Sequence, residues 1–179
     1  MPHRPDPAEC LAEILAHSLD DLLMALGLTS VRMPALPPHP ASTHALCAMA
    51  SFGNPDLSVS LALLGEPALF HMLRPKPPIE GQLDAADWAC ELANQAAGRM
   101  RNRLADYGLI LEARVPELTP AQHLARALSS TPVRLPLVLR IGDSLLEAWL
   151  LAGWTPGLAL QPNPSRPTRA LAEGAVMLF

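Results

Sequence analysis

Two stretches of the chain repeat apolar residues at helical spacing. Residues 7–27 carry leucine and isoleucine at intervals of three and four, and the stretch ends at Gly27. This pattern is typical of an amphipathic helix that packs one face on a core and stops at a glycine. A second, longer stretch covers residues 84–107 and is also followed by a glycine, so we predict a helix there as well. A shorter helix is predicted in "GEPALFHMLRP", between Pro67 and Pro75.

Other stretches favour strands. "THALCAMASF" and "DLSVSLALL" are apolar runs separated by "GNPD", a strong turn signal, and together they predict a hairpin. "LILEARVPEL" predicts a strand that ends at Pro116, and "PAQHLARALSS" predicts a short helix. "PVRLPLVLRIGDSLLEAWLLAGW" predicts two strands that turn at Gly142 and Asp143. This order of elements indicates an α+β fold with a largely antiparallel sheet, packed with a long central helix and an N-terminal helix.

Prolines divide the chain into blocks. The 20 prolines cluster in "MPALPPHP", "RPKPP" and "QPNPSRP", and such clusters mark loops because proline fixes φ and lacks a backbone donor. A length of 179 residues suits one domain, so we predict a single domain over residues 1–179. Residues 155–179 form a Pro-rich C-terminal tail, whose pattern leaves helix, strand and loop open.

The helix predicted over residues 84–107 carries polar residues on one side. At about 100° per residue, Glu91, Asn94 and Gly98 fall within about 60° of one another, in line with Asp87. The apolar residues spread over the other half, which is expected to pack: Trp88, Ala89, Leu92, Ala93, Ala96, Met100 and Leu104. Glycine inside a helix costs about 1 kcal/mol relative to alanine, and asparagine is also a poor helix former. A flat position at Gly98, beside a carboxylate and an amide, lets another backbone or side chain approach the helix closely.

Composition and charge limit the class of protein. Hydrophobic residues make up 50% and charged residues 17%, which indicates a globular chain. The net charge of −4 and the lack of a long basic run argue against nucleic acid as the main partner. The sequence shows neither a signal peptide nor the roughly 20 apolar residues of a membrane span. We therefore expect a cytoplasmic protein that binds no membrane.

The cysteines and histidines predict no metal site. Cys10, Cys47 and Cys90 are far apart in the sequence, so we expect reduced, partly buried thiols rather than disulfides. His39 and His44 precede Cys47, but their spacing matches no strong zinc pattern.

The segment "ELANQAAG" resembles the signature of the CheC/CheX/FliY phosphatases of bacterial chemotaxis, in which a helix carries Glu-x-x-Asn followed four residues later by glycine. The resemblance continues into "RVPEL", since the family's helix also ends at a glycine and its next strand reaches a proline. It covers roughly residues 8–150 and is specific across about 85–117. The chain departs from the family at Gln95 and Ala96, where members usually have bulky apolar residues. Its first predicted helix has no second acid–amide pair, so the single-site, CheX-like form fits better.

The resemblance implies a CheX-like phosphatase that accelerates hydrolysis of the aspartyl phosphate on a response-regulator receiver domain, similar to CheY. It implies that Asn94 positions the attacking water and that Glu91 pairs with the lysine of the receiver. These two are the implied catalytic residues. Partner contacts are implied for the neighbouring positions: Gly98, Asp87, Gln95 and Arg101. The chain itself is expected to bind no metal or cofactor, because the receiver holds the Mg²⁺.

Other hypotheses stay open. A CheX-like scaffold could dock a receiver or a flagellar-switch partner without catalysis, and Gln95 and the missing second motif keep this alternative. A structural homodimer could pair through a sheet edge or the apolar tail. Glu-x-x-Asn also occurs by chance on exposed helix faces that contact only solvent. Arg99, Arg101 and Arg103 alternate around the helix, which is more typical of a solvated face than of a phosphate clamp.

Overall fold

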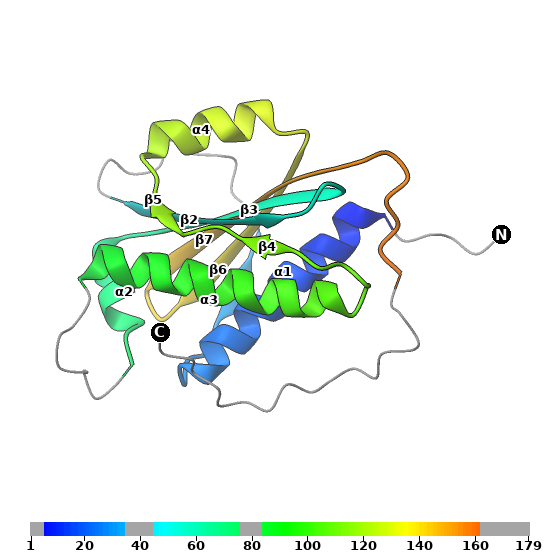
Figure 1. Cartoon of the computed structure of the whole chain (residues 1–179). Coiled ribbons are helices and arrows are strands. Elements are labelled where there is room, and N and C mark those ends of the chain that lie inside the picture. Colours follow the sequence, from blue (N-terminus) through cyan, green and yellow to red (C-terminus); the bar gives the residue numbers. More distant parts are fainter. Residues whose placement is uncertain (1–5, 35–44, 76–83, 162–179) are drawn as a thin grey trace.

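A computed structural model of the chain describes residues 6–34, 45–75 and 84–161 (Figure 1). Its elements follow in chain order: α1 (Pro7–Ala25), β1 (Val31–Met33), β2 (Leu46–Gly53), β3 (Leu57–Gly65), α2 (Pro67–Met72), α3 (Ala85–Ala105), β4 (Glu112–Ala113), β5 (Glu117–Leu118), α4 (Ala121–Ser130), β6 (Val133–Ile141) and β7 (Ser144–Trp154). The strands form one sheet in the order β1-β6-β7-β3-β2-β4, and β5 also pairs with β2. All these pairings are antiparallel, which confirms the predicted α+β class.

The sheet separates two layers of helices. In Figure 1, α1 and α3 lie on one side of the sheet and α4 lies on the other. Side chains alternate along β3 accordingly, because successive residues of a strand point to opposite faces. Leu61 and Leu63 belong to the main core shared with α1, α2 and α3, whereas Ala62 and Leu64 belong to a smaller core under α4. The face that carries α3 is thus the main packing face of the molecule.

Local signals set the ends of the two long helices. The side chain of Asp84 caps α3 by accepting hydrogen bonds from the backbone N–H groups of Ala86 and Asp87, each at 2.8 Å. Both α1 and α3 end in the same motif, with Gly27 and Gly108 at φ +72° and +81°. The residue after each glycine donates its N–H to a carbonyl five residues back. The helices predicted over residues 7–27 and 84–107 are confirmed, with ends that move by one or two residues.

The sheet edge beside β2 differs from the single strand predicted in "LILEARVPEL". Instead, β4 and β5 both pair with β2, on either side of a bulge. Ala113 lies opposite Phe52 and Glu117 opposite Met49, so three edge residues span the space of two on β2. Within the bulge, Val115 is 88% exposed.

The remaining predicted elements agree with the structure within its described ranges. The hairpin of β2 and β3, the short helices α2 and α4, and the β6–β7 turn are confirmed. The three-residue strand β1 was not predicted, because it is too short to show a periodic pattern. Residues 155–161 form neither helix nor strand, and the rest of the predicted tail lies outside the described residues. No helix in these ranges has the length and apolar character needed to cross a membrane.

Candidate functional site on the exposed face of α3

One half of α3 is buried as its periodicity predicts. This half packs mainly on β2, and also contacts α1 and α2. Its buried residues are Ala85, Trp88, Ala89, Leu92, Ala93, Ala96, Ala97, Met100 and Leu104. On the opposite half, Asp87 and Asn94 are exposed, and Glu91 and Gly98 are half-buried. We call these four residues the α3 stripe. The structure therefore brings together on one accessible face the residues that the sequence pattern singled out.

Two arginines anchor α3 on either side of this stripe. Arg101 donates from Nε to the backbone carbonyl of Leu111 at 2.9 Å, which ties α3 to the segment leading into β4. Arg103 forms an ion pair with Asp21 of α1. At about 100° per residue, Asn94 lies on the Arg101 side of the stripe and Glu91 about 60° closer to α1. The stripe is consequently an open strip between α1 and the bulged sheet edge. Whether Arg101 also contacts a partner stays a prediction.

The Glu91 carboxylate is held from one side only. Gln95 donates from Nε2 to Oε1 of Glu91 at 2.8 Å, across one turn of the helix. In the part of the chain that the structure describes, neither the second carboxylate oxygen nor the Asn94 amide has a partner. A carboxylate only accepts hydrogen bonds, whereas an amide both donates and accepts. The stripe therefore offers an acceptor for a cation beside a group that can orient water.

Gly98 leaves the surface flat one turn beyond Asn94. A Cβ built on Gly98 would meet no atom within 4 Å apart from the helix's own nearby backbone. No packing among the described residues explains the glycine, and its small size leaves room for another backbone or side chain to approach.

The N-terminal half of α3 is acidic. The pKa of the Cys90 thiol is raised, first by burial and then by the charges of Asp87, Asp84 and Glu117. The same carboxylates, together with Glu91, favour a cationic group on any partner that docks here. Because the raised pKa keeps Cys90 protonated at neutral pH, its sulfur is a poor nucleophile.

The described residues contain no group of three His, Cys, Asp or Glu side chains placed to hold a metal. Of the residues weighed as ligands in the sequence, His39 and His44 lie outside the described ranges. Cys47 is buried in the small core under α4, and burial raises its pKa to about 12. The absence of a bound metal or cofactor stays a prediction.

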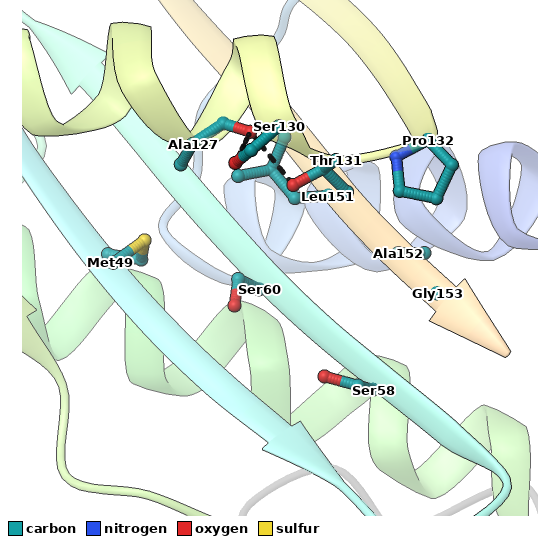
Figure 2. A pocket seen from close by; sticks show the side chains of 10 residues that line it. All are labelled: Met49, Ser58, Ser60, Ala127, Ser130, Thr131, Pro132, Leu151, Ala152 and Gly153. Carbon is teal, nitrogen blue, oxygen red and sulfur yellow. Dashed lines mark hydrogen bonds between the residues drawn. The ribbon is translucent and has the colours of Figure 1, made fainter.

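A second hollow lies on the opposite face of the sheet (Figure 2). This groove of about 300 Å³ runs between the C-terminal end of α4 and strands β3 and β7. Ser130 and Thr131 line it, but both hydroxyls donate to the carbonyl of Ala127, at 3.2 and 2.8 Å. Ser60 shares a hydrogen bond with Ser51. Among the described residues that line the groove, none has a charged or amide side chain, so the groove offers fewer groups for binding or catalysis than the stripe does.

Comparison with solved structures identifies the fold. No protein-family model and no curated protein matches the sequence. The structure is nevertheless similar to CheX from Vibrio vulnificus, with a TM-score of 0.59 and 10% identity, over 78% of this chain and 93% of that one. It is equally similar to CheX from Desulfovibrio desulfuricans, with a TM-score of 0.59 and 9% identity, over 80% and 99% of the two chains. The chain has the CheC/CheX/FliY fold.

A third CheX-like structure was solved with a partner. It is the complex of CheX, CheY, BeF₃ and Mg²⁺ from Borrelia burgdorferi, which matches with a TM-score of 0.53 and 13% identity, over 83% of this chain and 99% of that one. At these identities the likeness to CheX concerns the fold alone. The roles of Glu91, Asn94 and the other predicted site residues therefore depend on the geometry of the stripe.

Proposed function

We propose that this chain is a CheX-like phosphatase that hydrolyses the aspartyl phosphate of a receiver domain. The observation that carries the proposal is the α3 stripe, where, among the residues that the structure describes, an exposed Asn94 without a partner lies beside a carboxylate that keeps one free oxygen. A structure of the same fold binds CheY, which supports a CheY-like receiver as the partner.

The reaction needs a positioned water rather than a nucleophile from this chain. Water attacks phosphorus, the bond between phosphorus and the aspartyl oxygen breaks, and the products are inorganic phosphate and the free carboxylate of the receiver. The Asn94 amide accepts a hydrogen bond from the water and donates another, as the water-orienting glutamine of small GTPases does. Correct placement alone lowers the barrier by several kcal/mol. The Mg²⁺ that neutralises the phosphoryl group belongs to the receiver.

Glu91 docks the receiver. Its carboxylate, flanked by the negative charges of Asp84 and Asp87, pairs with the lysine ammonium of the receiver. Gly98 allows the surface of the receiver to approach α3 at the level of Asn94. Asp87, Gln95 and Arg101 border this contact.

The test is the decay of a phosphorylated receiver in the presence of the protein. Wild type accelerates the decay, Asn94→Ala lowers kcat at least tenfold, and Glu91→Ala mainly raises KM. Asn102→Ala is the matched control, since Asn102 is an exposed asparagine of the same helix and lies two turns away. Unchanged decay of every receiver encoded in the source genome on addition of wild type would refute the proposal.

The second candidate is a CheX-like module that binds a receiver without catalysis. Gln95 favours it, because this polar residue follows Asn94 at a position where the phosphatase family usually has a bulky apolar residue. In that case the receiver binds, Glu91→Ala weakens binding, and Asn94→Ala changes nothing.

A further inference from the structure

Gln95 holds the carboxylate of Glu91 on one side of the stripe. Its Nε2 lies 2.8 Å from Oε1 of Glu91, and both side chains are half-buried. Residues four apart are neighbours on a helix surface, and an amide that donates to a carboxylate forms a charge-assisted hydrogen bond. Gln95 lies about 40° from Glu91 toward α1, so the contact draws the carboxylate away from the sheet edge.

Asn94 is a second possible donor to this carboxylate, on its other side. It lies three residues from Glu91, which is also a neighbouring position on a helix. Its Nδ2 group carries the same two donors as that of Gln95. Yet no hydrogen bond joins Asn94 to Glu91 in the described residues. A bond between them would direct the Asn94 amide into the helix surface and away from an incoming water.

We propose that Gln95 is a positioning residue that turns the Glu91 carboxylate toward α1, away from Asn94, and so keeps the Asn94 amide free. This inference rests on the proposed function for its kinetic consequence, but the competition for Glu91 is a property of the chain alone. One oxygen of Glu91 remains for the receiver, and Asn94 remains for the water. A leucine at position 95 cannot donate, so Asn94 takes its place on Glu91.

Two variants and a control test the kinetic consequence. Gln95→Leu keeps a good helix former at a half-buried position, and Gln95→Glu places a second carboxylate beside Glu91. Both are expected to lower kcat for receiver dephosphorylation about tenfold, with a smaller effect on KM. Gln122→Leu removes an exposed amide from α4, on the opposite face of the sheet, and leaves kcat unchanged. Circular dichroism checks that each variant is folded.

Side-chain amide NMR tests the competition without any receiver. In wild type, the Asn94 Nδ2 protons should have the chemical shift and the exchange rate of a side-chain amide without a hydrogen-bond partner. Glu91→Ala should change the chemical shift of the Gln95 Nε2 protons and leave that of the Asn94 protons unchanged. In Gln95→Leu, the Asn94 protons move downfield and exchange more slowly, and the double variant Glu91→Ala/Gln95→Leu reverses this change.

The outcomes separate the two proposals. If Asn94→Ala abolishes the activity but Gln95→Leu keeps the wild-type kcat, the positioning role is refuted and the phosphatase stands. If the Asn94 protons are the same in wild type and Gln95→Leu, the competition is refuted whatever the activity. If no receiver is dephosphorylated while the Asn94 protons shift as expected, the proposed function fails and the competition for Glu91 stands.

Discussion

Replacing Gly98 by alanine should stabilise the fold and, if the proposed function holds, weaken receiver binding. Gly98 lies inside α3, and a Cβ added there meets no neighbouring atom of the described residues within 4 Å. Alanine is therefore free to contribute its full helix propensity, about 1 kcal/mol more than glycine. In a domain of this size, that gain raises Tm by about 2–4 °C. Most substitutions at a working surface destabilise or do nothing, so a gain here would be distinctive.

The same methyl group occupies the place where the receiver approaches. We expect receiver binding to weaken several-fold in Gly98→Ala and more than tenfold in Gly98→Leu, measured by titration with the receiver alongside thermal unfolding. Asn102→Ala is the control, because it also replaces a poor helix former on the exposed side of α3 but lies one turn further along the helix. Wild-type affinity in Gly98→Leu would show that no partner approaches there. A lower Tm in Gly98→Ala would refute the description of Gly98 as an open position.

Three smaller perturbations test separate parts of the structure. Burial raises the pKa of Cys47 from 9.0 to about 12, so its contribution to stability is complete below pH 9 and is lost as pH rises toward 12. Between pH 8 and pH 11, the free energy of unfolding measured in urea should fall by about 2–3 kcal/mol more in wild type than in Cys47→Ala. Equal decreases in the two proteins would contradict this. Asp84→Ala should cost about 1 kcal/mol by removing the cap of α3, whereas Asp84→Asn should retain most of that stability; a cost of zero would mean that the cap is dispensable. Val115→Asp should change stability by less than about 0.5 kcal/mol, yet weaken receiver binding if the bulge takes part in docking; unchanged binding would confine the contact to α3.

The long helices and the stripe could be predicted because their signals are local. The buried half of α3 follows the helical period, and its ends are set by Asp84 and Gly108 within a turn of the helix. A stripe of polar residues opposite that half follows from the same period. The spacing of four residues is a sequence signal for the Glu91–Gln95 contact as well. From the sequence, however, Gln95 was predicted only to contact the partner.

The borders of the stripe could not be predicted, because contacts between distant segments create them. Arg103 and Asp21 are 82 residues apart in the sequence. Arg101 reaches a backbone carbonyl rather than a charged side chain, and no residue type marks such an acceptor. The bulge at Val115 depends on the register of β4 and β5 against β2, which is fixed only when the sheet forms. Pro116, which lies within this bulge, predicted the end of a strand but not the bulge itself.

The two adjacent aspartates of α1, Asp20 and Asp21, differ from Glu91 in the partner that the fold gives them. Asp20 pairs with Arg32 of β1, and Asp21 pairs with Arg103 of α3, so both carboxylates are neutralised by contacts that hold neighbouring elements to α1. The helix also contains no asparagine or glutamine. Within the described residues, by contrast, the carboxylate of Glu91 has a hydrogen bond only to the neutral amide of Gln95 and forms no ion pair. A carboxylate already paired with arginine gives up that contact before it binds another cation, at a cost of up to about 1 kcal/mol for exposed pairs such as these, whereas Glu91 can accept a cation without breaking an ion pair. The charge of the internal partner therefore separates Asp20 and Asp21, which hold neighbouring elements to α1, from Glu91, which is available for recognition.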